Sequence, residues 1–289
     1  MRTIAAFFLL FLFLNLALVF AQAPDYSQLD PKPFDPNTEP DIDMFIADWR
    51  ESKPIQTFGS LLERDIFTRC EGDPLRPVTK GAVLQYINRF THAVLQKNKS
   101  TTPSTLKEEQ IIFYFVSGKG LMKAGSKTAA LHDGVGVLMP EGLEFTMTNI
   151  GNEPLEMYVI AEPVTPGFKP SKEMIVKDEN TLPIGTTKSH WSHILRPLFY
   201  HIEALATLTG MSPVCFDPMT LGQPHSHGEG AEEIWFVVEG DVILHLGKEL
   251  RKLTPGMAYK IPTNGKTPHS NINVSADKQM KLVWFMVVK

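Results

Sequence analysis

Hydrophobic positions from about residue 81 onward come in short runs bounded by turn-forming residues. Residues 111–116, 155–160 and 281–288 are such runs, and they are rich in β-branched and aromatic side chains. Gly, Pro, Asn and Asp interrupt the chain between runs at intervals of about 8–12 residues, a pattern typical of antiparallel sandwiches and barrels. The pattern therefore predicts an all-β fold without βαβ units.

The part of the chain before residue 81 has a different pattern. Prolines at positions 24, 31, 33, 36 and 40 stand among Asp and Asn with almost no apolar periodicity, which predicts an extended, solvated arm. After Asp41, a residue type suited to an N-cap, the apolar positions 42, 45, 46 and 49 follow at helical spacing. We assign residues 24–80 to a proline-rich arm with a short helix.

The first 23 residues are typical of a signal peptide. Arg2 precedes an apolar stretch from Ile4 to Phe20, and Ala21-Gln22-Ala23 supplies the small-residue pattern of a cleavage site. An uncleaved membrane anchor is the alternative that the length of the stretch allows. We expect cleavage, which leaves 289 − 23 = 266 residues as a secreted or periplasmic protein. No later run approaches the ~20 apolar residues of a membrane span.

The chain also contains an internal repeat. Gly118 and Gly240 each close a predicted strand and lie 122 residues apart, and the same separation relates Pro140 to Pro262. A following Asn recurs after 124 residues, at positions 149 and 273, which indicates a two-residue insertion in the second copy. We therefore expect two tandem barrels at residues 81–165 and 196–289, joined by a linker at 166–195.

Composition and charge narrow the class of function. The chain has 28 Lys and Arg against 32 Asp and Glu, with a formal net charge of −4 and a pI near 6.1. No nucleic-acid partner is expected from this balance. Two cysteines are too few for a disulfide scaffold or a cysteine-rich zinc module. The sequence leaves open whether Cys70 and Cys215 pair.

The second copy carries residue types that bind metal ions. His225 and His227 project to the same side of an extended segment, because alternate residues share a face. Glu233 opens the strand that ends at Gly240, and His269 shares a face with Asn271 and Asn273 in a later segment. In a small barrel these side chains can converge, and three imidazoles with one carboxylate would form a ligand set for Mn, Fe, Ni or Zn.

Three neighbours of this set are candidates for lining the pocket or supporting the ligands. By strand alternation Trp235 shares a face with Glu233, and Asn271 shares a face with His269. Glu232 is the third candidate and the alternative ligand, because four residues would then separate it from His227, although its distance to Gly240 would be one residue too long. We prefer Glu233 as the ligand, since alternation up to the closing Gly240 points its side chain inward.

These residues resemble the two sequence motifs of the cupin superfamily. The first motif, G-x5-H-x-H-x(3,4)-E-x6-G, is matched from His225 to Gly240, although the gap before Glu233 is one residue longer than the pattern. The second motif, G-x5-P-x-G-x2-H-x3-N, is matched from Gly256 through His269 to Asn273 with two extra residues. The chain resembles a bicupin, which implies two tandem double-stranded β-helix (jelly-roll) barrels.

The first copy lacks this ligand set. The corresponding positions hold Pro103, Thr105, Ile111 and Phe145. None of these side chains is a useful metal ligand. We predict that the first barrel is metal-free, filled by apolar side chains and mainly structural.

The resemblance also implies a function. Cupins include dioxygenases, decarboxylases, isomerases and hydrolases that act on small oxygen-rich molecules, and we expect a metal-dependent enzyme with oxidoreductase or dioxygenase-like, or decarboxylase-like, chemistry. We expect one divalent metal ion per chain, with Mn or Fe favoured over Zn or Ni. No catalytic base is assigned. A non-catalytic bicupin that binds a small molecule or sugar is the main alternative, and a storage-type structural protein is a third. A homodimer is expected from the resemblance alone.

Overall fold

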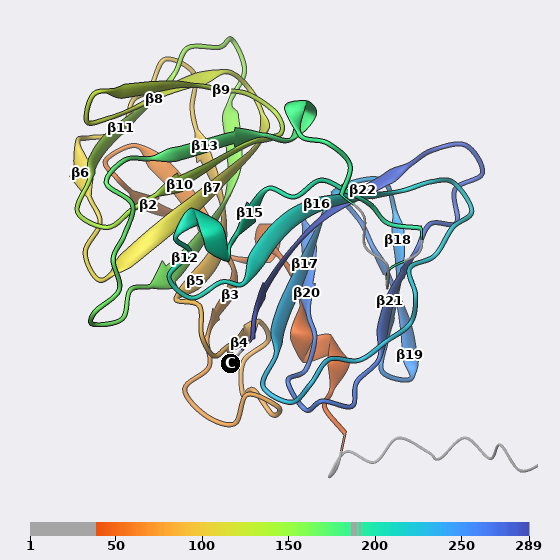
Figure 1. Cartoon of the computed structure of the whole chain (residues 1–289). Coiled ribbons are helices and arrows are strands. Elements are labelled where there is room, and N and C mark those ends of the chain that lie inside the picture. The colour runs from red at the N-terminus through yellow and green to blue at the C-terminus, as the bar shows by residue number, and fades with distance from the viewer. Residues whose placement is uncertain (1–38, 186–189, 191, 289) are drawn as a thin grey trace, which may run out of the picture. The chain divides into compact units, whose positions relative to one another are not determined.

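The computed structural model describes residues 39–185, 190 and 192–288, so the predicted signal peptide and residues 24–38 of the predicted arm lie outside the described residues. Residues Pro40–Lys289 form one compact unit. The described chain is built from β-strands and a few single turns of 3-10 helix, which confirms the predicted all-β class (Figure 1). Among these residues no helix is both long enough and apolar enough to cross a membrane.

The first barrel consists of a large and a small sheet. Its strands are β2 (Ile55–Thr57), β3 (Leu61–Arg69), β4 (Ala82–Leu84), β5 (Arg89–Leu95), β6 (Ser104–Thr105), β7 (Glu109–Ser117), β8 (Gly120–Ala124), β9 (Lys127–Leu131), β10 (Val135–Met139), β11 (Glu144–Asn149), β12 (Leu155–Pro163) and β13 (Ile175–Asp178). The large sheet has the order β13-β10-β7-β12-β5-β3-β2, with β4 beside β3. The small sheet has the order β6-β11-β8-β9.

The second barrel repeats this plan. Its strands are β1 (Ile46–Asp48), β14 (Ile194–Leu195), β15 (Phe199–Tyr200), β16 (Gly210–Phe216), β17 (Glu232–Glu239), β18 (Val242–Leu246), β19 (Glu249–Leu253), β20 (Met257–Lys260), β21 (His269–Ile272) and β22 (Met280–Val287). The large sheet has the order β1-β20-β17-β22-β16-β14, with β15 also beside β16. The small sheet has the order β19-β18-β21.

The predicted short helix is only partly present. Asp41 caps a 3-10 helix, η2 (Ile42–Phe45), by accepting a hydrogen bond from the Asp43 N–H at 3.1 Å. The chain then becomes β1 instead of continuing as a helix, and β1 pairs antiparallel with β20 of the second barrel. A second 3-10 helix, η3 (Trp49–Glu51), follows. Pairing with an open sheet edge satisfies the backbone groups of this segment and overrides a four-residue helical pattern.

The boundaries of the first barrel also differ from the predicted ones. Strands β2 and β3 precede residue 81, yet they extend the large sheet through the pairing of β3 with β5. Strand β13 lies within the predicted linker and pairs with β10. The rest of the described linker contains η4 (Glu179–Thr181), and η5 (His201–Glu203) follows β15.

Strand alternation explains why the central runs look uniformly hydrophobic. In β7, Phe113 and Phe115 fill the interior of the first barrel, whereas Tyr114 faces the second barrel. In β17, Trp235 points into the second barrel and Phe236 packs against the first. Because the two large sheets pack against each other, both faces of their central strands are buried and neither face needs polar residues.

The internal repeat is visible in backbone geometry. Gly118 and Gly240 have φ values of 85° and 76°. A Cβ on Gly118 would lie 2.4 Å from the Pro154 carbonyl oxygen, and glycine avoids both this clash and the strain of a positive φ. Asn149 and Asn273 are both buried, and each donates side-chain hydrogen bonds to backbone carbonyls of its own barrel. The two copies therefore use the same residues for the same turns.

The two cysteines do not pair in this structure. Cys70 follows β3, and its N–H donates to the Leu84 carbonyl. Cys215 lies on β16 opposite Lys281, and both thiols are free. Burial raises the pKa of Cys215.

Candidate metal centre

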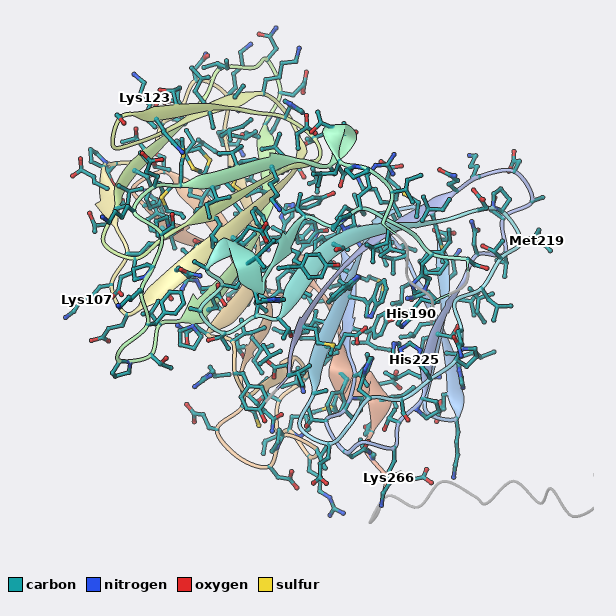
Figure 2. All side chains as sticks on the ribbon, in the orientation of Figure 1. Lys107, Lys123, His190, Met219, His225 and Lys266 are labelled. Carbon is teal, nitrogen blue, oxygen red and sulfur yellow. The ribbon has the colours of Figure 1, made fainter. Side chains whose placement is uncertain are left out.

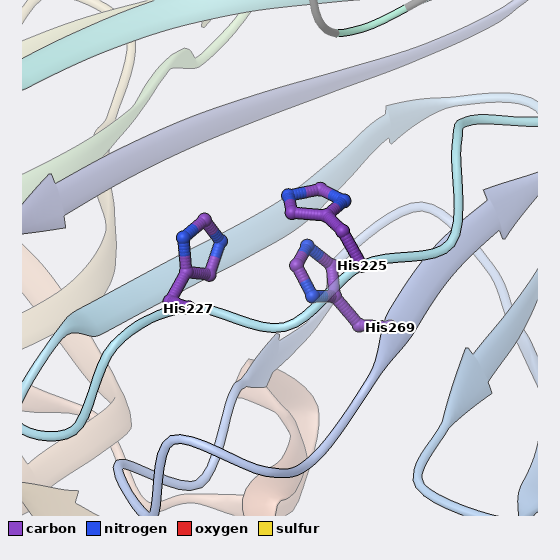
Figure 3. A group of neighbouring side chains, drawn as sticks. All are labelled: His225, His227 and His269. Atoms are coloured by element: carbon purple, nitrogen blue, oxygen red, sulfur yellow. The ribbon is translucent and has the colours of Figure 1, made fainter.

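Backbone pairing brings His225 and His269 together. The His269 N–H donates to the His225 carbonyl at 2.9 Å, and the His225 N–H donates back at 3.3 Å. His227 lies two residues along the same extended segment as His225. One ring nitrogen from each of the three histidines lies within 4.8 Å of the others, and Figure 3 shows the three rings gathered at one place.

Glu233 joins this cluster from β17. Its carboxylate contacts His227 Nε2, and its Oε1 lies 3.6 Å from His269 Nε2. Trp235, two residues along the same face, donates its indole N–H to Glu233 Oε1. Strand alternation therefore places Glu233 inside the barrel, on the side that the sequence predicted.

The environment favours the charged form of Glu233. Burial by itself would raise its pKa, but the close contacts with His227 and His269 outweigh burial and hold that pKa well below the ordinary value of a carboxyl group. For His227, burial would lower the pKa, but contact with Glu233 raises it overall. The side-chain carboxylate is 5% exposed, so its charge requires a neighbouring cation.

His225 is oriented for binding through Nε2. Its Nδ1 lies 2.8 Å from the Gln223 carbonyl oxygen, which can only accept, so Nδ1 carries the proton. The lone pair of the neutral ring is then on Nε2. Burial lowers the pKa of His225 and favours this neutral form. A backbone carbonyl that fixes the tautomer in this way is a common partner of a metal-binding histidine.

The donor atoms fit a divalent metal ion. His227 Nε2 and both ring nitrogens of His269 are buried without a hydrogen-bond partner, although His227 touches Glu233. Buried polar atoms seldom remain unpaired, and a cation held between nitrogens and a carboxylate would satisfy them. Three imidazoles and a carboxylate suit Mn, Fe, Zn or Ni.

A cavity of about 180 Å³ reaches this cluster. His227 and Glu233 are part of its lining, together with aromatic and apolar side chains that include Trp235, Trp284 and Met286. This volume suits a small molecule. The cavity thus gives the cluster access to a ligand, which a purely structural metal site does not need.

Two histidines from the predicted linker, outside the predicted ligand set, also line this cavity. His190 Nε2 lies 3.2 Å from His225 Nε2, and Figure 2 shows the two side chains close together. His193 packs against Trp235, with ring centroids 5.9 Å apart. Burial lowers the pKa of His193 to about 4, so this ring is neutral. The His-x-x-His spacing just before the second barrel was the only sequence signal for this contribution.

The three residues predicted to line the pocket or support the ligands lie in different places relative to the cavity. Trp235 contacts Glu233 and lines the cavity. Asn271 is buried and accepts a hydrogen bond from the Tyr259 hydroxyl at 3.1 Å. The prediction that Glu232 lines the pocket was wrong. Because it is adjacent to Glu233 on a strand, it points the other way, accepts the Gln85 N–H and lies 3.9 Å from Lys260 Nζ.

The first barrel has a different interior at the matching positions. Ile111 and Phe145 are buried in its apolar core cluster. Pro103 and Thr105 are exposed at its surface. Apolar side chains form the core cluster of this barrel, but Glu63 and Thr91 are also fully buried, and the Thr91 hydroxyl donates a hydrogen bond to the Glu63 carboxylate.

Comparisons with known proteins agree with this architecture. Residues 91–161 and 214–286 each match the cupin domain family. No curated protein sequence matches the chain. Among solved structures, a putative glyoxylate-induced protein from Pseudomonas aeruginosa has a TM-score of 0.66 at 12% identity, covering 84% of this chain and 88% of that one. A mutant of Bacillus subtilis oxalate decarboxylase has a TM-score of 0.63 at 9% identity, covering 84% and 77%. Vicilin from Corylus avellana has a TM-score of 0.62 at 11% identity, covering 84% and 85%.

Two tandem jelly-roll barrels, each matched by the cupin domain, define the class of this protein. The chain belongs to the cupins and is a bicupin whose metal-binding motif is intact only in the second barrel. At these identities the similar structures share its fold, and their activities belong to those proteins.

Proposed function

We propose that this bicupin is a metal-dependent enzyme that acts on a small oxygen-rich molecule. The reaction would be of the oxidoreductase or dioxygenase-like kind, or decarboxylase-like. The observation that carries the proposal is that three imidazoles and a buried carboxylate converge where a cavity reaches them. We propose one divalent ion per chain, Mn or Fe, held by His225, His227, Glu233 and His269.

An ion bound there would act as a Lewis acid for a bound oxygen group or as a redox centre. His225 is fixed for this role by its hydrogen bond to the Gln223 carbonyl. Trp235 orients the Glu233 carboxylate through its indole N–H. The apolar walls formed by Trp284 and Met286 limit water around the reacting group, which strengthens electrostatic interactions at the site.

Export and assembly are part of the proposal. We propose that residues 1–23 direct export and are cleaved, so that the enzyme works as a secreted or periplasmic protein. A homodimer is proposed from the resemblance to other cupins. Sequencing the N-terminus of the exported protein and measuring its mass in solution test these two points.

Elemental analysis of the exported protein tests the metal site. We expect one mole of Mn or Fe per mole of chain, and none in the His225→Ala variant. His132→Ala is a matched control, because His132 lies in the first barrel with a side chain that is 45% exposed. If neither the exported protein nor protein resupplied with Mn, Fe, Zn and Ni binds metal, the proposal is wrong.

Turnover separates an enzyme from a binding protein. We would measure oxygen uptake and carbon dioxide release by the metal-loaded protein with a panel of small hydroxy acids, diketones and dicarboxylates. Activity that His225→Ala loses and His132→Ala keeps would support the proposal. Saturable binding of a panel member without turnover would support the non-catalytic alternative.

A further inference from the structure

The linker brings a fourth histidine to the metal centre. His190 Nε2 lies 3.2 Å from His225 Nε2, and the two ring planes cross at 73°. His190 precedes β14, whose pairing with β16 attaches the linker to the large sheet of the second barrel. The cupin motifs do not include a residue at this position. The contact therefore belongs to this chain's own linker.

The two nitrogens that face each other are the ones able to bind a metal ion. His225 donates its Nδ1 proton to the Gln223 carbonyl, so its Nε2 presents a lone pair. That lone pair accepts a hydrogen bond from His190 Nε2 in this structure, so the His190 proton must move to Nδ1 before His190 can bind an ion through Nε2. An ion bound by His225 would therefore lie close to the His190 ring.

The spacing of these nitrogens matches two ligands of one ion. With metal–nitrogen bonds of about 2.1 Å, adjacent ligand nitrogens lie about 3.0 Å apart at a 90° angle and about 3.4 Å apart at a tetrahedral angle. The observed 3.2 Å falls between these values. The same ion could bind both rings without a large movement of either.

The position of His190 is supported by packing. Its ring stacks on His193, with centroids 5.1 Å apart and planes inclined by 18°. His193 in turn packs against Phe216 and Trp235. Gly222 leaves room for this arrangement, because a Cβ there would lie 3.0 Å from His193 Nε2. The His193 ring therefore acts as a support that holds His190 over the metal centre.

We propose that His190 is a fifth, displaceable protein ligand of the metal ion. This inference rests on the proposed metal site. It adds that the number of atoms through which a substrate binds the ion decides whether His190 must leave. With His190 bound, an octahedral ion has one open position instead of two. A molecule that binds through one atom fits beside His190, whereas a molecule that chelates through two oxygens must displace it. His190 would then select among ligands by the number of atoms that they bring to the ion.

Metal titration tests the ligand role directly. Metal-free exported protein would be titrated with Mn²⁺ by calorimetry and with Co²⁺ by visible absorption, for the wild type, His190→Ala and the His132→Ala control. We expect His190→Ala to retain one ion per chain, to bind it at least about tenfold more weakly and to change the Co²⁺ spectrum, because one nitrogen ligand is lost. His190→Gln keeps most of the side-chain volume and replaces the first variant if that one does not fold.

Competing ligands separate a metal ligand from a residue that only supports the site. Acetohydroxamate chelates through two oxygens, and azide binds through one nitrogen. In Co²⁺-loaded protein we expect His190→Ala to bind acetohydroxamate about tenfold more tightly, since no protein ligand must leave, and to bind azide as the wild type does. A general disturbance of the site would weaken both ligands.

The outcomes distinguish this inference from the function that it rests on. A wild-type protein that binds no metal refutes the proposed function. A wild type with one ion per chain, together with a His190→Ala variant that matches it in Mn²⁺ affinity, Co²⁺ spectrum and acetohydroxamate affinity, overturns the fifth-ligand inference alone.

Discussion

Replacing Phe236 with Ala should destabilise the whole protein without emptying the metal site. Phe236 is 0% exposed and packs against Tyr158 and Phe90 of the first barrel, with ring centroids 4.2 and 5.3 Å away. Burial of 150–250 Å² at about 25 cal/mol per Å² corresponds to about 4–6 kcal/mol for the whole side chain. Alanine keeps the Cβ, so we expect a loss of about 4 kcal/mol, within the 3–5 kcal/mol typical of buried Phe→Ala changes.

Thermal unfolding measures this effect. For the 289 − 39 = 250 residues of the compact unit, an unfolding entropy of about 2.1 cal/mol/K per residue gives about 0.5 kcal/mol/K, so 4 kcal/mol lowers Tm by about 8 °C. Leu250→Ala is the control, because Leu250 is 58% exposed and its loss should cost under about 0.5 kcal/mol. If the Tm of Phe236→Ala falls by less than about 2 °C, or if one barrel unfolds in a separate transition, the interface between the two large sheets is not a shared core. Loss of bound metal at 25 °C would refute the assignment of the two faces of β17.

Three further predictions concern the site. The double variant His225→Ala/His227→Ala should contain no metal while its far-ultraviolet circular dichroism stays that of the wild type, because the apolar interior of the second barrel is otherwise intact. Glu233→Gln should weaken Mn²⁺ binding by at least about 10- to 100-fold, whereas Glu232→Gln should keep one ion per chain. Calorimetric titration measures both variants. An equal loss of Mn²⁺ affinity in the two would contradict the opposite directions of the Glu232 and Glu233 side chains on β17. Mn²⁺ affinity should fall as the pH drops through the raised pKa of His227, by about tenfold per pH unit for each proton that the ion displaces, because only the neutral ring binds metal; an affinity that is constant from pH 7.5 to pH 5.5 would show that His227 is not a ligand.

The inward direction of Glu233 could be predicted because strand alternation is a local rule. Once Gly240 marks the end of a strand, alternate residues share a face, and this rule separated Glu233 from Glu232 correctly. The apolar interior of the first barrel followed from the repeat in the same way. Each of these predictions needed only residues within one strand or its copy.

Contacts between distant segments could not be predicted from local patterns. The spacing of Ile42, Phe45, Ile46 and Trp49 fits one helical face, but the open edge of β20 makes residues 46–48 a strand. His190 reaches the candidate metal centre only through the path of the linker between the barrels. Strand pairing and the path of a linker depend on where the assembled sheets have open edges. A short stretch of sequence carries no information about those edges.

The pairing of β1 with β20 has a consequence for how the chain is made. Ile46 lies opposite Tyr259, so the edge of the second large sheet is completed by a segment that is synthesised more than 200 residues before its partner. During synthesis this short strand has no β20 edge to pair with until the second barrel has been made. Contacts this far apart in sequence slow folding because a long loop must close first. A chain shortened to the second barrel would lack β1, and the edge of β20 would then be open to pairing between chains.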